Sequence, residues 1–276
     1  LVVLMTDFGT DDWYVGTMKG VIKTICPRAE IIDLCHNVSP HSIAIGSLML
    51  SASYRYFPAG SIFVAVIDPG VGTTREPILV RAADRWFLAP NNGLLGFLLT
   101  AAPSRPECRI LSNPEYHLPF PSSTFHGRDI FAPCAAHLAN GVSYTQLAPA
   151  TCELYGRPIT TASADRGIIE GNIIHFDHFG NAVTNIAKEL LDELIQAQLP
   201  RPAGRTLAPE DFSVQVGGHI IGCISRTYGD VDPGALLAYW GSTGHLEIAI
   251  NRGSAREQLS LQLLDKVVVR PSDHVC

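Results

Sequence analysis

Three residues in the first half of the chain are of types that can together activate a water molecule. Asp68 and Arg75 flank the segment Pro-Gly-Val-Gly-Thr-Thr, and His126 lies in the later segment Phe-His-Gly-Arg-Asp. A carboxylate can accept a proton from water or orient an imidazole, and a guanidinium can fix the charge of that carboxylate. Each residue also has an ordinary structural interpretation, because an acid after a strand often forms a turn and a loop arginine is often solvated. The spacing alone leaves both interpretations open.

The elements expected before these residues would place their loops at one edge of a sheet. The apolar run 63–67 predicts a buried strand that ends at Asp68, and the run 1–5 predicts another that ends before the acidic turn carrying Asp7. In open α/β sheets, ligands bind just beyond the carboxyl ends of the strands. The two carboxylates therefore lie where a ligand site is expected.

The first part of the chain alternates between two kinds of periodicity. Strands are expected at 1–5, 30–34 and 63–67, and helices at about 12–25 and 41–57. This alternation is typical of a parallel sheet with right-handed helical crossovers. We expect residues 1–150 to form an N-terminal α/β sandwich with a mostly parallel sheet.

The second part of the chain has a different pattern. Residues 151–166 are rich in Pro, Thr, Ser and Ala, which predicts a linker. From 167 to 276, short apolar runs recur between glycine-containing turns. This predicts a smaller C-terminal β-rich domain with an antiparallel sheet or barrel.

Two turns in this second domain contain residues suited to a nucleoside. In Asp-His-Phe-Gly-Asn at 177–181, Phe179 could stack on a purine ring and Asn181 could hydrogen-bond its edge. In Gly-Ser-Thr-Gly at 241–244, Ser242 could bind a carboxylate. Both segments are also serviceable hairpin turns, so the residues alone do not decide between binding and structure.

Composition and missing motifs exclude several classes of function. The net charge of −6 is spread along the chain and no Lys/Arg cluster is present, so we expect no nucleic-acid partner. The sequence contains no G-x-x-x-x-G-K-[ST] phosphate loop, no G-x-G-x-x-G after the first strand and no G-x-S-x-G nucleophile motif. A metal site could recruit Asp7, His126, Asp177 and His178, but no two histidines have H-x-x-x-H or H-x-H spacing, so we do not expect a metal.

Cysteine usage and hydropathy point to the cytoplasm. The seven cysteines form no C-x-x-C pair and are expected to be reduced thiols. No apolar run approaches the length of a membrane span, so we expect no membrane partner. The apolar run 1–5 lacks a basic flank and is expected to be a strand, not a signal peptide.

Six motifs, taken in order, resemble the S-adenosyl-L-methionine (SAM) hydroxide adenosyltransferases, relatives of the SAM-dependent fluorinase and chlorinase. They are T-D-F-G-T-D-D at 6–12, D-P-G-V-G-T-T-R at 68–75, A-P-N-N-G-L-L at 89–95, F-H-G-R-D-I-F-A-P at 125–133, D-H-F-G-N at 177–181 and G-S-T-G-H-L-E-I-A at 241–249. The resemblance spans nearly the whole chain, and six motifs in order are far more specific than one.

The resemblance implies a fold, an assembly and a reaction. The family has an N-terminal α/β sandwich and a C-terminal β-barrel-like domain. Its members form homotrimers with active sites between the N-terminal domain of one subunit and the C-terminal domain of the next. They attack C5′ of SAM with water or hydroxide and release adenosine and L-methionine, so the resemblance implies that SAM is the substrate and that no cofactor is used.

Residue by residue, the resemblance assigns three kinds of role. The resemblance implies that the water is captured and activated by Asp68, Arg75 and His126. Asp7 resembles the residue that binds the ribose hydroxyls, with His41 and Phe125 beside it. The family's adenine pocket is matched here by Phe179, Asn181 and Tyr228. Its contacts to the methionine amino and carboxylate groups are matched by Asp11, Asp177 and Ser242.

Departures from the fluorinase pattern favour a hydrolase. The fluorinases have Tyr and Thr where this chain has Asp68 and Val71, Trp in place of His41 and Ser in place of Gly127. Gly127 alone does not decide the matter, because the chlorinase resembles this chain there. An anionic Asp68 would repel a halide and suits a water that must lose a proton. The alternatives are a SAM-dependent halogenase of the same fold and a non-catalytic protein that binds SAM or another adenosyl compound.

Overall fold

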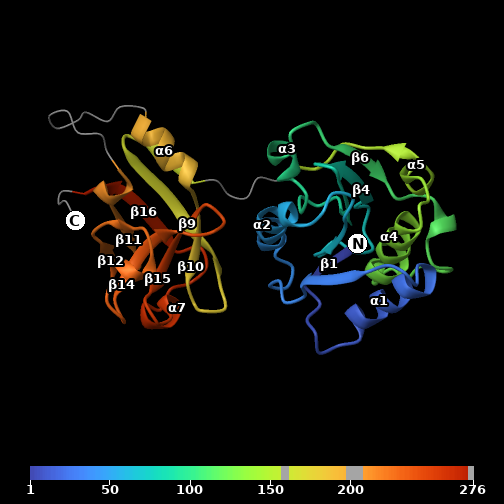
Figure 1. The fold of residues 1–276 in the computed structure, drawn as a ribbon, viewed down its shortest axis with the longest axis horizontal. Coiled ribbons are helices and arrows are strands. Elements are labelled where there is room, and N and C mark those ends of the chain that lie inside the picture. Colours follow the sequence, from blue (N-terminus) through green and yellow to red (C-terminus); the bar gives the residue numbers. More distant parts are fainter. Residues whose placement is uncertain (157–161, 197–207, 273–276) are drawn as a thin grey trace. The chain divides into compact units, whose positions relative to one another are not determined.

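The chain folds into two compact units, residues 1–159 and 160–276. The structure is a computed structural model, and it describes residues 1–156, 162–196 and 208–272 (Figure 1). Residues 157–161 of the predicted linker lie outside the described residues. Each unit has its own hydrophobic core, and each is described by itself.

Within residues 1–156, seven strands form one mixed sheet, in the order β2-β1-β3-β5-β4-β6-β7. β2, β1, β3 and β5 are parallel, whereas β4, β6 and β7 extend the sheet in antiparallel fashion. The predicted α/β class is confirmed, and its parallel part is the half of the sheet that carries β1 and β3. The bounds are β1 Val2–Thr6, β2 Ile31–Cys35, β3 Ile62–Val66, β4 Pro77–Ala82, β5 Arg85–Pro90, β6 Glu107–Ile110 and β7 Ala150–Thr151.

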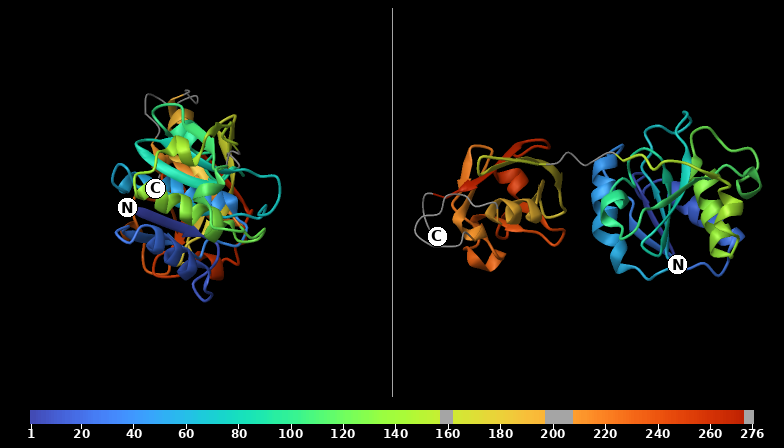
Figure 2. Two further views of the ribbon diagram at one scale, coloured as in Figure 1. Left: turned by 90° about the vertical axis from the view of Figure 1, so that its right-hand side faces the viewer. Right: turned by 90° about the horizontal axis from the view of Figure 1, so that it is seen from above.

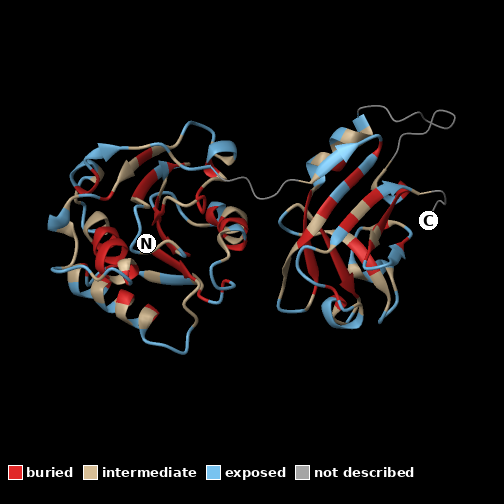
Figure 3. Ribbon diagram, turned by 180° about the vertical axis from the view of Figure 1, so that it is seen from behind, coloured by how far each residue is buried: buried red, intermediate tan, exposed pale blue. Residues whose placement is uncertain are grey.

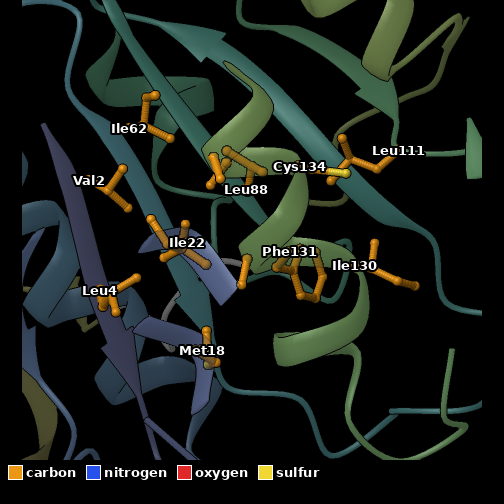
Figure 4. Packing of buried hydrophobic residues seen from close by; sticks show 14 of the residues in the cluster. Val2, Leu4, Met18, Ile22, Ile62, Leu88, Leu111, Ile130, Phe131 and Cys134 are labelled. Atoms are coloured by element: carbon orange, nitrogen blue, oxygen red, sulfur yellow. The ribbon is translucent and has the colours of Figure 1, made fainter. Parts of the chain in front are cut away.

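Helices cover both faces of this sheet, which explains why its central strands are apolar throughout. Val2 and Leu4 of β1 pack with α1 and α4, whereas Val3 and Met5 face the cluster that contains α2 (Figure 2). Figure 4 shows the first cluster, where Leu4 lies with Met18 and Ile22 of α1. The helices of this unit are α1 Tyr14–Ile25, α2 Ile43–Ser53, α3 Leu98–Ala101, α4 Ala132–Ala139 and α5 Tyr144–Leu147.

The second unit is a curled, nearly all-antiparallel sheet around one core, as the barrel-like prediction requires. In its described part the strand order is β12-β11-β16-β9-β10-β15-β14-β13, β8 pairs with β9, and only the β13–β14 pairing is parallel. Figure 3 shows buried and exposed residues alternating along its long strands. The bounds are β8 Ser163–Asp165, β9 Ile168–Phe176, β10 Ala182–Ala187, α6 Lys188–Gln196, β11 Phe212–Val216, β12 His219–Ile221, β13 Ile224–Ser225, β14 Leu236–Trp240, β15 His245–Ile250, α7 Ala255–Gln258 and β16 Lys266–Pro271.

Among the described residues, the cysteines depart from the expectation at Cys223. Free thiols are present at Cys26, Cys35, Cys108, Cys134 and Cys152. Cys223 takes part in a disulfide, so the expectation of a reduced thiol is wrong there. None of the helices in the described ranges combines the length and the apolar character that a membrane span requires.

Candidate functional site

Asp68, Arg75 and His126 form one hydrogen-bonded cluster in the first unit. Arg75 Nε donates to Asp68 Oδ1 at 3.0 Å, and Arg75 Nη2 donates to Asp68 Oδ2. The same Nη2 lies 2.7 Å from His126 Nδ1. The side chains of Asp68 and Arg75 are only 4% and 8% exposed. Arg75 therefore joins the three residues selected from the sequence, with Asp68 and Arg75 largely shielded from solvent and His126 half-buried.

The glycine-containing loop after β3 brings Arg75 back onto Asp68. The chain turns tightly, with Val71 N donating to Asp68 O at 3.2 Å and Thr73 N to Gly70 O at 3.1 Å. Gly72 has a φ of +76°, and a Cβ there would lie 2.5 Å from Ser123 O. Only glycine suits both the left-handed backbone and this close approach. Gly72 thus lets the loop of Asp68 and Arg75 pack against the segment that leads to His126.

Asp129 holds the segment before His126 in place through hydrogen bonds. It is buried, and its Oδ2 accepts from Ser122 N at 2.8 Å while its main-chain oxygen accepts from Leu118 N at 2.9 Å. Arg128 pairs with the same carboxylate. A π-helical turn, Gly127–Phe131, follows His126 and leads into α4. Arg128 and Asp129 therefore hold the loop in place.

The contact with Arg75 determines where His126 carries its hydrogen. A guanidinium can only donate, so His126 Nδ1 must accept, and the neutral ring has its hydrogen on Nε2. Burial, and then the charge of Arg75, lower the pKa of His126 below that of an ordinary histidine. The cluster thus combines an acceptor, the Asp68 carboxylate, with a donor, His126 Nε2–H.

Asp7 lies at the same edge of the sheet. β1 and β3 are parallel with Thr6 opposite Val66, so Asp7 and Asp68 follow the carboxyl ends of adjacent strands. Asp7 Oδ2 accepts from the backbone N of His41 at 2.8 Å, and His41 has a left-handed φ of 65°. The structure thus brings Asp7 and His41 together.

Phe125 and Asp11 differ in their surroundings. Phe125 is buried in an aromatic cluster, with ring centroids 6.0 Å from Phe8 and 5.1 Å from Tyr14. Asp11 is exposed in the loop before α1. Phe125 therefore has a packing role that is independent of any ligand, whereas Asp11 is free to meet one.

In the second unit, Asp177, Asn181 and Tyr228 form a hydrogen-bonded group. Asp177 Oδ1 accepts from the backbone N of Phe179 and of Asn181, at 2.9 and 2.8 Å. Asn181 Nδ2 donates to Asp177 Oδ2 at 2.8 Å and to Tyr228 OH at 2.9 Å. Phe179, Asn181 and Tyr228 line a cavity of about 500 Å³, and Phe179 is 74% exposed. Ser242 is exposed in the turn between β14 and β15.

The sequence reasoning missed further residues around this cavity. Asn251 lines it and supports it, because its Nδ2 donates to Tyr228 O at 3.1 Å and to Val231 O at 2.8 Å. Arg252 and Gly253 line it as well. These three residues directly follow β15, which carries most of the 241–249 motif. Their position next to this motif is the sequence feature by which they could have been found.

The metal hypothesis finds no cluster to support it. Within residues 1–156, 162–196 and 208–272, no group of three or more His, Cys, Asp or Glu side chains is arranged to hold a metal ion. The four residues considered for a metal come from both units, with Asp7 and His126 in the first and Asp177 and His178 in the second.

Comparison with known proteins identifies the family. A family model described as the SAM hydroxide adenosyltransferase N-terminal domain matches residues 2–148, and the model of the C-terminal domain matches 171–268. The chain belongs to this family. An (R)-S-adenosyl-L-methionine hydrolase of Thermus thermophilus is 36% identical over 95% of this chain and 96% of its own length. A hydrolase of the same name from Salinispora arenicola is 34% identical over 96% and 95%.

The chain is also similar to a more distant relative and to a solved structure. A fluorinase of Nocardia brasiliensis is 28% identical over 92% of this chain and 91% of its own length. A crystal structure of an uncharacterized conserved protein from Thermotoga maritima superposes with a TM-score of 0.86 at 34% identity, covering 98% of this chain and all of the other. Family membership therefore agrees with the resemblance drawn from the six motifs.

The contact at Gly72 yields a stability prediction. Gly72→Ala forces a Cβ onto Ser123 O, whereas Gly60→Ala places one at a similar φ of +81° with nothing within 4 Å. The Gly60 variant should lose roughly 1 kcal/mol for the backbone conformation alone. The Gly72 variant should lose about 1–3 kcal/mol more from the clash. Denaturant unfolding of both variants measures the difference, and equal losses would show that the two loops do not meet at this point.

Proposed function

We propose that this protein hydrolyses SAM by attack of water or hydroxide at C5′, giving adenosine and L-methionine. The observation that carries the proposal is the buried Asp68–Arg75–His126 cluster beside the carboxyl edge of the sheet. Support comes from the full-length relatives, which are named (R)-S-adenosyl-L-methionine hydrolases. We accordingly propose the (R) diastereomer of SAM as the substrate.

The substrate sets modest demands on the protein. When the C5′–S bond breaks, its electron pair goes to the sulfonium sulfur, and methionine departs as a neutral thioether. The leaving group therefore requires neither a general acid nor a Lewis acid, and we propose that the reaction uses no metal and no cofactor. The protein must hold one oxygen in line with the C5′–S bond and receive one proton.

The tautomer of His126 determines which residue holds the attacking oxygen and which residue receives its proton. With Nδ1 facing Arg75, the imidazole offers Nε2–H, so it donates a hydrogen bond to the attacking oxygen and does not remove its proton. Asp68 keeps lone pairs beyond its two bonds to Arg75 and accepts the proton. Arg75 holds both partners in position, and the proton then passes to solvent.

Substrate contacts are proposed from the placement of the remaining residues. Asp7 binds the ribose hydroxyls beside His41 and Phe125, and Phe179, Asn181 and Tyr228 hold adenine. The methionine end of the substrate is bound by the carboxylates of Asp11 and Asp177 and by the hydroxyl of Ser242. The amides around Asp177 already occupy its oxygens, so its part is chiefly its charge opposite the methionine ammonium.

We also propose the assembly and location that the family resemblance implies. The chain would form a homotrimer, with each active site built from the first unit of one subunit and the second unit of its neighbour. The division of the assigned residues between the two units supports this arrangement. We propose a cytoplasmic location as well; the five free thiols among the described residues support it, whereas the disulfide of Cys223 does not.

The first test identifies the product. Purified protein is incubated with resolved (R)-SAM or (S)-SAM in ¹⁸O-water, with and without chloride. The proposal predicts adenosine carrying ¹⁸O in its 5′-hydroxyl, formed from (R)-SAM, with no 5′-chloro-5′-deoxyadenosine. Mass spectrometry distinguishes the outcomes: the chlorinated nucleoside would support a halogenase, and tight binding without product would support a non-catalytic SAM-binding protein.

A second test separates the proton acceptor from the hydrogen-bond donor. Asp68→Asn should lower kcat by roughly 10²–10⁴-fold, because it removes the group that receives the proton. His126→Gln retains an oxygen for Arg75 and an N–H for the attacking oxygen, so it should lose only about tenfold. His126→Ala removes both groups and should lose more. If His126 were the base, the Gln and Ala variants would be equally impaired.

The wild-type pH profile checks the same assignment. Protonation would put an N–H of His126 against Arg75, so activity should fall as the pH drops through the pKa of His126. Since burial and Arg75 lower that pKa, this decline should lie below about 6.5, the ordinary histidine value.

A further inference from the structure

A line of hydrogen bonds in the second unit runs from Asn181 to a carboxylate that does not line the cavity. Asn181 Nδ2 lies 2.9 Å from Tyr228 OH, and Tyr228 OH lies 2.6 Å from Tyr239 OH. Tyr239 OH in turn donates to Glu247 Oε2. Tyr239 and Glu247 are opposite each other on β14 and β15. Neither of them belongs to the residues assigned to the substrate.

The direction of every bond in this line follows from its far end. Tyr239 gives its single hydroxyl hydrogen to Glu247, so the oxygen of Tyr239 accepts the hydrogen of Tyr228. The oxygen of Tyr228 is then left to accept from Asn181 Nδ2. The second hydrogen of Nδ2 goes to Asp177. Both hydrogens of the amide are therefore drawn away toward carboxylates, one directly and one through two tyrosines.

The surroundings of Glu247 keep its carboxylate in place. Its side chain is buried, and a Cβ on Gly241 would lie 1.9 Å from Glu247 Oε1, so the absence of a side chain at Gly241 makes room for the carboxylate. Burial raises the pKa of Tyr239, which keeps this phenol protonated and able to donate. Gly241 belongs to the 241–249 motif, so this motif carries both ends of the Gly241–Glu247 contact.

The amide of Asn181 consequently presents one group to a ligand. Asn181 lines the cavity with Phe179 and Tyr228, and among the described residues its Oδ1 has no hydrogen-bond partner. A carbonyl oxygen accepts hydrogen bonds and cannot donate them. A purine with an amino group at C6 satisfies it, whereas a purine with an oxo group there places two acceptors face to face.

We propose that Tyr239 and Glu247 are positioning residues for base selection: they fix the direction in which the Asn181 amide faces, so that the cavity accepts 6-amino purines and rejects 6-oxo purines. This rests on the proposed function for the class of ligand. Glu247 acts without touching the ligand, through the tyrosine pair and Asn181.

The test compares three nucleosides that differ at C6: adenosine with an amino group, purine riboside with hydrogen, and inosine with an oxo group and the accompanying hydrogen on N1. Calorimetry on the full chain measures Kd for each with the wild type, Glu247→Gln and Tyr239→Phe. The wild type should bind adenosine most tightly and inosine least. In both variants the inosine-to-adenosine Kd ratio should fall about tenfold, as expected for one weakened hydrogen bond, while the Kd of purine riboside stays constant.

A matched control addresses general damage to the sheet. Thr184 is fully buried on β10, and its Oγ1 donates to Leu246 O at 2.8 Å in a bond that is not part of this line. Thr184→Val removes a buried hydrogen bond from the same sheet and should leave the Kd ratio unchanged. A ratio that falls equally in this control would assign the effect to loss of structure and overturn the proposal, as would an unchanged ratio in both Glu247→Gln and Tyr239→Phe.

The outcomes also separate this inference from the proposed function. Hydrolysis of SAM with an unchanged ratio would overturn the positioning role alone. A lowered ratio in a protein that does not hydrolyse SAM would support the positioning role and remove the hydrolase proposal. A wild type that does not bind adenosine would overturn both.

Discussion

The first unit is organised around a buried guanidinium that serves two acceptors. Arg75 makes a two-point contact with Asp68 and reaches His126 with the same nitrogen. Removing a charged pair from water costs free energy, and a buried pair is retained only where its geometry satisfies the charges. The rest of the unit supplies this geometry: β3 delivers Asp68, the turn at Gly72 returns Arg75, and a π-helical turn presents His126. Disruption of β3, of the turn at Gly72 or of the π-helical turn would leave a buried polar group without its hydrogen-bond partner.

The second unit applies the same physical principle to a neutral group. There an amide is oriented by carboxylates on two sides, Asp177 directly and Glu247 through Tyr228 and Tyr239. In both units the hydrogen bonds of a charged side chain fix the orientation or the tautomer of a neighbouring residue. Such orientation costs nothing at the moment of binding or reaction, because it is already in place in the folded protein.

Much of the architecture could be predicted from the sequence because its cause is local. The run 1–5 is apolar at every position since both of its faces are covered, and periodicity is sufficient to predict that strand. The position of Asp68 after a buried strand likewise suggested a site at the sheet edge.

Contacts that depend on long-range packing could not be predicted in this way. Nothing in the spacing of Asp68 and Arg75 requires a two-point contact, and nothing near His126 shows which ring nitrogen meets Arg75. The approach of Gly72 to Ser123 joins loops whose neighbourhood only the fold creates. Tyr239 and Glu247 become partners through the register of β14 and β15, which the sequence pattern does not determine.

The central claim is that Arg75 fixes His126 as the tautomer with its hydrogen on Nε2, leaving Asp68 to accept the proton. The most direct test is ¹⁵N NMR of the histidine side chains in the full-length protein above the pKa of His126, with the resonances assigned through a His126→Gln variant. The prediction is a pyrrole-like, protonated Nε2 and a pyridine-like, unprotonated Nδ1. A protonated Nδ1 in the wild type would contradict the claim, because His126 would then face the substrate with a free lone pair and could itself serve as the base.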